Sequence, residues 1–283
     1  SMFLFLGFAA MFLNVAMSWA TDGGLDTTFG TGGIVTTDVG GSPNAFHALV
    51  IQPDGKIVGA GLSSVYGSNY DFAVIRYNAN GSLDTAFGTG GIVITDIGGS
   101  YDYVTALGIQ SDGKIVASGI FSVSGNTYFT VVRYNTNGSL DTTFGSGGIV
   151  TTNILSAYPT SLDIQADGKI VVAGYSYDSN GSSYDDFTLV RYNTDGSLDT
   201  TFGKSGIVTT DIGGCHDYAL ALGIQPDGKI VTSGYSWDSS RHDFAVVRYN
   251  ADGSLDTTFG TGGIVTTDVG SNNNESASAF GIQ

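Results

Sequence analysis

The chain has 283 residues, 41% of them hydrophobic, and a formal charge of −16 at pH 7 with only ten lysines and arginines. A negative field of this size repels phosphate backbones and anionic lipid surfaces, which excludes nucleic acid and membranes as partners of the mature protein. The 43 glycines, and the fact that Glu275 is the single glutamate among 26 acidic residues, favour strands and tight turns over helices. The composition therefore predicts an all-β protein.

Residues 1–20 form the first predicted element. Phe3 to Met17 is almost unbroken apolar sequence and ends at the small-residue motif Ser18-Trp19-Ala20. This pattern is typical of a secretory signal peptide cleaved after Ala20. The apolar stretch is shorter than the roughly 18 residues that a membrane anchor usually needs. We therefore expect an exported protein whose mature part, residues 21–283, is a repeat domain.

The mature part repeats with a period of 57 or 58 residues. The hexapeptide Leu-Asp-Thr-x-Phe-Gly begins at Leu25, Leu83, Leu140, Leu198 and Leu255. The tripeptides Asp-Gly-Lys and Arg-Tyr-Asn each recur four times, at fixed places in the unit. A period this long indicates one supersecondary unit per repeat, packed beside its neighbours.

Each unit contains four strand signals. In the fourth unit they are residues 206–211, 219–225, 229–235 and 243–250, all β-branched or aromatic and bounded by Gly, Asn or Asp. Four antiparallel strands repeated radially make a β-propeller. We expect four complete blades plus a partial fifth, in a ring that is incomplete or truncated, with residues 33–38 suited to an outer strand. The alternatives are a five-bladed ring, a longer parent chain, or a second copy that completes the ring.

Loop lengths divide the propeller into two sides. The connection through Asp-Gly-Lys and the connection from Arg-Tyr-Asn to Gly-Ile-Val keep their lengths in every unit, and the other two connections vary. In a meander, alternate loops emerge on the same side of the sheet. The constant loops should therefore lie on one side, and any binding site on the other.

These three motifs resemble those of the bacterial delta-60 repeat proteins, from about Leu25 to Gln283. The resemblance implies a β-propeller fold and export to the bacterial surface or beyond. It carries no known activity and therefore no site residues.

The variable loops carry aromatic residues beside Asp, Asn and Ser, a composition that suits stacking on sugar rings or anchoring a partner protein. The candidates for ligand binding are Tyr101, Tyr103, Tyr175, Tyr177, Tyr235 and Trp237. Imidazole and carboxylate groups of one blade could also converge on a transition metal or share a proton. These candidates are His216, Asp217, His242 and Asp243.

The repeated aspartates and basic residues have an architectural interpretation. Aspartate in turns bonds backbone amides two residues on, and each Arg of Arg-Tyr-Asn is expected to pair with a loop carbonyl or with the Asp of Leu-Asp-Thr, such as Arg76 with Asp84. Calcium is a further possibility at residues 193–199, although the glycine falls too early for an EF-hand loop. No other cofactor is expected.

No Gly-x-Ser-x-Gly, His-Glu-x-x-His or Walker motif occurs in the sequence. We therefore expect a protein that is not an enzyme, an adhesion or scaffold module that binds a glycan or a surface protein on its variable side. The alternatives are a propeller hydrolase or lyase centred on His216 and His242, and an inert spacer in a longer surface protein.

Overall fold

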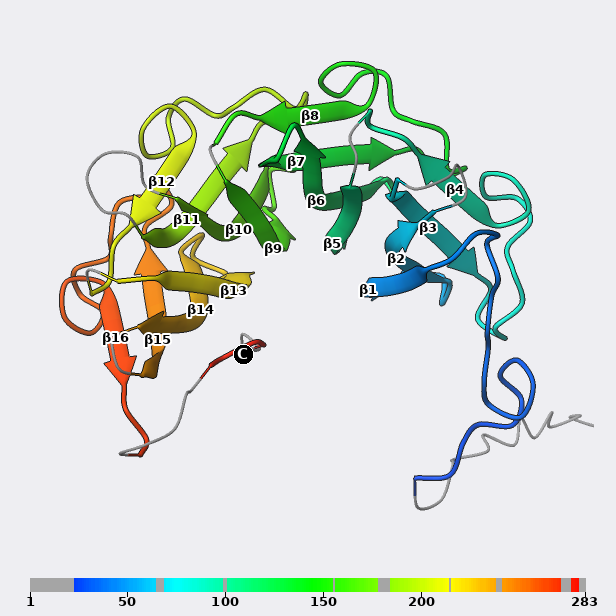
Figure 1. Ribbon diagram of the computed structural model, residues 1–283, viewed down its shortest axis with the longest axis horizontal. Coiled ribbons are helices and arrows are strands. Elements are labelled where there is room, and N and C mark those ends of the chain that lie inside the picture. Colours follow the sequence, from blue (N-terminus) through cyan, green and yellow to red (C-terminus); the bar gives the residue numbers. More distant parts are fainter. Residues whose placement is uncertain are drawn as a thin grey trace, which may run out of the picture.

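The computed structural model describes residues 23–64, 69–98, 101–154, 156–177, 184–213, 215–237, 241–270 and 276–279. The predicted signal peptide of residues 1–20 lies outside these residues. Every regular element within them is a β strand, and the strands form four sheets of four antiparallel strands each (Figure 1). The all-β prediction and the four-stranded blade are confirmed.

Each sheet is a meander in which consecutive strands are neighbours. The first sheet contains β1 (Asn44–Ile51), β2 (Ile57–Ser63), β3 (Asp71–Tyr77) and β4 (Ile92–Thr95). The second contains β5 (Tyr101–Ile109), β6 (Ile115–Val123), β7 (Asn126–Tyr134) and β8 (Ile149–Thr152). The third contains β9 (Ala157–Ile164), β10 (Ile170–Tyr177), β11 (Asp185–Tyr192) and β12 (Ile207–Thr210). The fourth contains β13 (Asp217–Ile224), β14 (Ile230–Trp237), β15 (His242–Tyr249) and β16 (Ile264–Thr267).

The short Ile-Val-Thr strands belong to a different sheet from the one that the sequence suggested. Residues 206–211 were expected to open the fourth unit, but β12 pairs with β11 of the preceding unit, with Val208 opposite Leu189. The reason is the tight connection before β12, in which the Gly206 amide bonds the Phe202 carbonyl and the Gly206 carbonyl accepts from Arg191. Residues 33–38 form no strand in the structure.

This assignment places the loops of each kind together. The constant connections join β1 to β2 and β3 to β4, on what we call the constant rim, and the variable connections join β2 to β3 and each sheet to the next, on the variable rim. The predicted separation of constant and variable loops follows from this order of strands.

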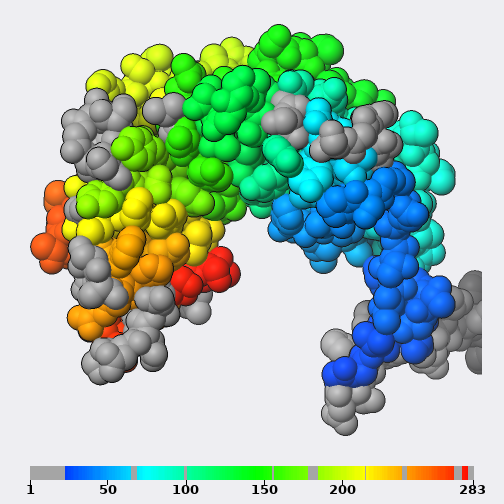
Figure 2. Space-filling view, viewed as in Figure 1, coloured from blue at the N-terminus to red at the C-terminus, as the bar shows by residue number. Residues whose placement is uncertain are grey.

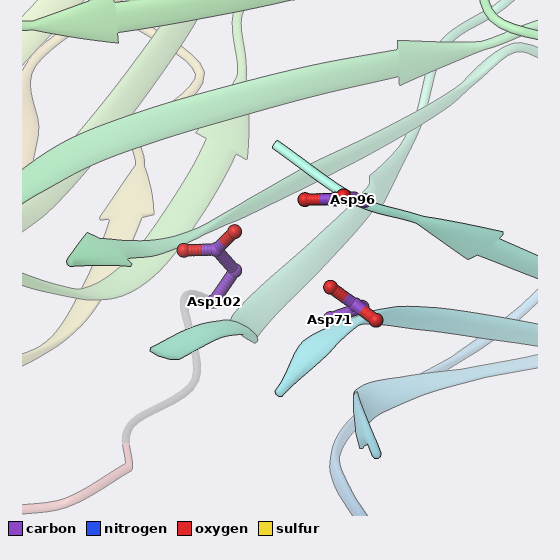
Figure 3. Close-up of side chains that lie close together, drawn as sticks. All are labelled: Asp71, Asp96 and Asp102. Carbon is purple, nitrogen blue, oxygen red and sulfur yellow. The ribbon is translucent and has the colours of Figure 1, made fainter. Parts of the chain in front are cut away.

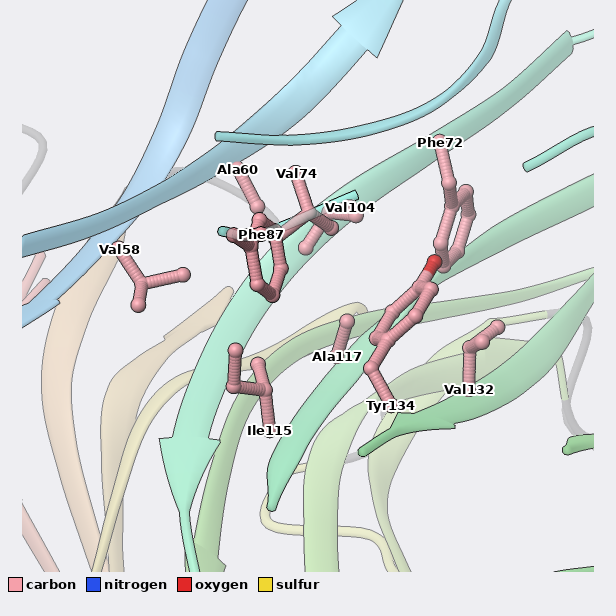
Figure 4. Packing of buried hydrophobic residues seen from close by; sticks show 10 residues of the cluster. All are labelled: Val58, Ala60, Phe72, Val74, Phe87, Val104, Ile115, Ala117, Val132 and Tyr134. Carbon is pink, nitrogen blue, oxygen red and sulfur yellow. The ribbon is translucent and has the colours of Figure 1, made fainter. Parts of the chain in front are cut away.

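Neighbouring sheets bury each other's faces. Between the first and second sheets, Phe72 and Val74 of β3 lie in one cluster with Val104 of β5 and Ala117 of β6, all fully buried (Figure 4). Strands covered on both faces contain continuous apolar runs, and in β3, whose seven residues are all buried, this run is Phe72 to Ile75.

The constant rim holds one charged node per blade. In the first blade the Arg76 Nε atom lies 2.8 Å from Asp84 Oδ2, and Lys56 Nζ lies 3.3 Å from the same oxygen. The Arg76 guanidinium also covers the Phe87 ring at 4.5 Å from its centroid. The predicted pairing of Arg76 with Asp84 is confirmed, and the motif residues recur together because they form this node.

The four blades follow one another along an open arc, with β1, β5, β9 and β13 on its inner side (Figure 1), and the space-filling view shows the arc open on one side (Figure 2). The face of β1 at the start of the arc is uncovered. Phe46 is 50% exposed there, whereas Val104, at the equivalent position of β5, is fully buried.

No helix in the described ranges is both long and apolar enough to cross a bilayer.

Candidate functional site

The inner strands of three blades carry a tyrosine at equivalent positions. These are Tyr103 of β5, Tyr158 of β9 and Tyr218 of β13, each in the second or third position of its strand. Blades three and four add Tyr175 and Tyr235 on the adjacent strands, directly opposite Tyr158 and Tyr218. The aromatic rings therefore gather where these two blades meet.

The rings form a continuous chain of contacts across the third and fourth blades. Tyr175 meets Tyr218 edge to face at 4.4 Å between centroids, and this contact joins the two blades. Tyr235 lies 4.9 Å from Tyr218 and stacks on His242 at 4.5 Å. His216 stacks at 5.7 Å on Trp237, which in turn lies 5.9 Å from His242. We call Tyr175, Asp185, His216, Tyr218, Tyr235, Trp237 and His242 the His216 cluster.

A carboxylate lies at the centre of this cluster. The Oδ2 atom of Asp185 is 3.0 Å from His216 Nδ1 and accepts a hydrogen bond of 3.1 Å from the Tyr218 hydroxyl. The Asp185 amide nitrogen is 3.2 Å from the same Nδ1 atom. Nδ1 thus has a partner in either protonation state, because it can donate to the carboxylate or accept from the amide. These contacts fix the orientation of the ring through Nδ1.

The tyrosines around Asp185 keep their protons. Burial, with Tyr158 and Asp185 nearby, raises the pKa of Tyr175 to about 12. Burial together with the charge of Asp185 and its hydrogen bond raises the pKa of Tyr218 still further, and burial and Asp185 raise that of Tyr235. At neutral pH these three tyrosines therefore present neutral hydroxyl groups.

The structure brings together five of the residues that the sequence nominated: Tyr175, Tyr235, Trp237, His216 and His242. The remaining nominated residues lie elsewhere. Tyr103 is on the second blade, where its ring packs against His47, and Tyr101 contacts Tyr70. Tyr177, at the end of β10, is 38% exposed.

The four nominated metal ligands do not face one another. His216 faces Asp185, while Asp217 is fully buried and accepts a 2.7 Å hydrogen bond from the Ile212 amide. Asp243 lies beside Arg241, with 3.7 Å between Asp243 Oδ1 and Arg241 Nε. Among the described residues, the groups of three that could share a metal ion contain aspartates only.

The stretch at residues 193–199, considered for calcium, forms a turn and a rim node. Asp195 accepts from the Ser197 amide and hydroxyl, and Asp199 binds Arg191 and Lys169 at 2.8 and 2.9 Å. Its carboxylates are thus engaged with protein groups.

Sequence reasoning missed Asp185, although a signal was present. When the repeats are aligned, the positions of Asp185 and His216 correspond to those of Tyr70 and Tyr101 at the first blade junction. The rings of these two tyrosines are 5.1 Å apart. The same pair of positions therefore meets at both junctions. Aligning the variable loops in this way would have singled out this pair of positions, but not their contact, which depends on how the blades pack.

The four four-stranded blades and their radial order define the class of the protein as a β-propeller. A family model described as "Domain of unknown function (DUF5122) beta-propeller" matches residues 52–87, 110–144, 165–202 and 225–259, once in each blade. The chain belongs to this family. No curated protein matches it.

Several solved structures resemble the chain in fold. A protein of unknown function from Dyadobacter fermentans DSM 18053 aligns at 12% identity and a TM-score of 0.47, covering 76% of this chain and 69% of that one. A PL25 ulvan lyase aligns at 13% and 0.44, covering 80% and 58%. An endo-arabinase from Bacteroides thetaiotaomicron VPI-5482 aligns at 12% and 0.44, covering 78% and 80%.

The expectation that the chain is not an enzyme is corrected, because the solved structures that align with it include a polysaccharide lyase and an arabinase. At 12–13% identity the likeness shows the fold alone. The activity of this chain has to be argued from its own site.

Proposed function

We propose that the chain is a carbohydrate-degrading propeller and that its active site is the His216 cluster. The observation that carries the proposal is the contact of 3.0 Å between His216 Nδ1 and Asp185 Oδ2, inside a chain of aromatic rings. A histidine held by a carboxylate is suited to general acid–base catalysis. Tyrosine and tryptophan rings beside polar groups are suited to the faces of sugars.

The charge of the protein favours a neutral substrate. The formal charge is −16, and Asp185 lies within the cluster, so a polysaccharide that carries carboxylates or sulfates would be repelled. A neutral sugar has no carboxylate to acidify a ring C–H bond, which disfavours elimination. Hydrolysis is therefore the reaction that we assign to the site.

In this reaction His216 Nε2 donates a proton to the leaving oxygen as the bond from the anomeric carbon to that oxygen breaks. A water oxygen bonds the same carbon and loses its surplus proton to solvent, from which His216 is protonated again. Asp185 holds the ring in place and stabilises its charged form. Trp237 and Tyr235 bind the sugar through their rings.

The test is the release of new reducing ends from a panel of neutral polysaccharides. The His216→Ala variant should lower kcat about 10²- to 10⁴-fold, and Trp237→Ala should mainly raise KM. His47→Ala is the matched control, because His47 packs on Tyr103 outside the cluster. Equal rates for wild type and His216→Ala, inactivity of the wild type on the whole panel, or unsaturated sugar products would each refute the assignment.

We also propose that this activity takes place outside the cell, as the apolar residues 3–17 and the motif at residues 18–20 predict. Expression in a bacterial host, followed by N-terminal sequencing of exported protein, tests this. A mature N-terminus at Thr21 is the expected result. Retention of the intact chain in the cytoplasm would contradict it.

A further inference from the structure

Three aspartates meet at the junction between the first and second blades, on the variable rim (Figure 3). Asp71 is the first residue of β3, Asp96 follows β4, and Asp102 is the second residue of β5. One carboxylate oxygen from each lies within 4.8 Å of the others. Asp71 is 2% exposed and Asp102 is fully buried.

The junction between the third and fourth blades repeats this arrangement with Asp186, Asp211 and Asp217. Their oxygens also lie within 4.8 Å of one another, and Asp186 and Asp217 are 3% and 0% exposed. In the repeat frame these residues are equivalent to the three of the first junction. The geometry is thus built twice by the same positions.

Each cluster contains a buried carboxylate oxygen without a hydrogen-bond partner. These atoms are Oδ2 of Asp71 and Oδ1 of Asp217. Buried carboxylate oxygens are almost always bonded in folded proteins, and an unsatisfied one needs a specific cause.

The second junction shows that the three positions change together. Between the second and third blades the equivalent residues are Tyr128, Asn153 and Ala157, so all three acids are replaced together. Aspartates that merely stabilised separate turns would have no reason to disappear together. Their joint loss is expected if the three act on one ligand.

The fourth blade has acids at the same three places, Asp243, Asp268 and Glu275, of which Glu275 lies outside the described residues, and it supplies its own cation. Arg241 Nη1 lies 3.2 Å from Asp268, and Arg241 Nε lies 3.7 Å from Asp243, at the positions equivalent to Asp96 and Asp71. The residue equivalent to Arg241 is Asn69 at the first junction and Tyr184 at the third. On the fourth blade the Arg241 guanidinium therefore lies where a cation would contact the carboxylates of Asp243 and Asp268.

Apart from Arg241, no lysine or arginine of the described ranges lies on the variable rim. All ten lysines and arginines lie in the described ranges, and eight of them belong to the Asp-Gly-Lys and Arg-Tyr-Asn motifs of the constant rim. Lys204 lies in the connection that precedes β12, on that same rim. A cation at the first and third junctions has to come from solution.

We propose that the first and third blade junctions each bind one Ca²⁺ ion through their three aspartates. Calcium takes carboxylate oxygens at about 2.3–2.6 Å, so oxygens on opposite sides of one ion are about 4.6–5.2 Å apart, which fits these clusters. Neither cluster contains the histidine or cysteine ligands that zinc prefers. The bound ion ties the last strand of one blade to the first strand of the next.

The test is calcium binding to the full chain after dialysis against a chelator, measured by isothermal titration calorimetry. The wild type should bind two ions. Asp71→Asn and Asp217→Asn should each bind one, and the double variant none. Asp112→Asn is the matched control, because its side chain is 53% exposed on the constant rim, and it should bind two.

Thermal unfolding gives a second readout. Calcium should raise the Tm of the wild type and of Asp112→Asn, should raise that of each single variant less, and should leave the double variant unchanged. Circular dichroism in chelator should show all variants folded, because Asn keeps the shape of Asp and removes buried charge.

No binding to the wild type at about 1 mM free calcium, the weak end of the range for extracellular modules, would overturn the proposal. Binding that survives in the double variant, or that falls equally in Asp112→Asn, would do the same. The wild type could also bind a single ion that is lost in only one of the two single variants. That result would overturn the proposed site at the junction altered in the other variant.

Discussion

Asp141 lies at the centre of the constant-rim node of the second blade, and its replacement tests how much these nodes stabilise the propeller. Its Oδ2 atom is 2.7 Å from Arg133 Nε and 3.2 Å from Lys114 Nζ, and its Oδ1 accepts from the Thr143 amide and hydroxyl. The Asp141 and Arg133 side chains are 5% and 6% exposed. Both charges are thus largely removed from water and depend on each other.

Asp141→Ala leaves the Arg133 guanidinium buried without its carboxylate. Breaking a buried pair in this way costs about 3–5 kcal/mol. The lower end, about 3 kcal/mol, is expected because Arg133 keeps its bond to the Thr194 carbonyl and its place over the Phe144 ring. Asp141→Asn keeps an acceptor for Thr143 and loses only the charged bonds, so it should cost about 2 kcal/mol.

The assay is urea unfolding at pH 7, with Asp112→Asn as control. Asp112 is half-exposed and binds the same lysine at 3.3 Å, so its loss should cost less than about 1 kcal/mol. Asp141→Asn within about 0.5 kcal/mol of the Asp112 control would refute the reasoning, because it would mean that the node is screened like a surface pair.

The same node predicts a pH dependence. Burial alone would raise the pKa of Asp141, but hydrogen bonds from Thr143 and Lys114 and the charge of Arg133 outweigh it and hold that pKa well below its usual range. A carboxyl with a lowered folded pKa stabilises the fold above its unfolded pKa of about 3.9 and loses that contribution as the pH falls through the folded value. The difference in stability between wild type and Asp141→Asn should therefore be full at pH 7 and shrink below about pH 4.

Three further predictions concern packing, ionisation and the His216 cluster. Gly119→Ala should destabilise the protein by about 3 kcal/mol in urea unfolding, because an added Cβ would lie 2.1 Å from the Tyr103 carbonyl oxygen. Gly147→Ala is the comparison: its added Cβ would meet no atom within 4 Å, but the residue has φ +65°, so the substitution should cost about 1 kcal/mol. Tyr175→Phe should remove one phenol that ionises at about pH 12 in alkaline absorbance titration, and a loss confined to pH 10 would contradict the burial argument. Trp237→Ala should reduce the tryptophan fluorescence response to a bound oligosaccharide, and an unchanged response would place sugar binding outside the His216 cluster.

The fixed spacing of the motifs allowed most of the fold to be predicted from the sequence. Arg76 and Asp84 recur eight residues apart in every unit, and since both are needed for one node, their pairing could be predicted. The strand order could not be predicted fully. β12 reads locally as a strand that could pair with either neighbour, and the choice is made by the tight loop between Phe202 and Gly206, which is a property of backbone hydrogen bonds.

The candidate site could be predicted only in part, because some of its residues stand at positions that repeat between blades and others occur in one blade alone. Tyr218 stands at a position that repeats in three blades, whereas Trp237, His216 and Asp185 do not repeat. Aromatic residues on the variable rim could be found by composition. The contact between Asp185 and His216 could not, because the two residues are 31 positions apart on different blades and meet only where the blades pack.

The two proposals meet at the junction between the third and fourth blades. Asp185 and His216 are followed directly in the chain by Asp186 and Asp217, and successive residues of a strand point to opposite faces. The contact that we assign to catalysis and the carboxylates that we assign to calcium are thus held by the same two backbone segments. At the first junction the acids are kept while Tyr70 and Tyr101 replace the pair. The proposed ion site therefore does not require the proposed catalytic pair, because the first junction has its three aspartates without that pair.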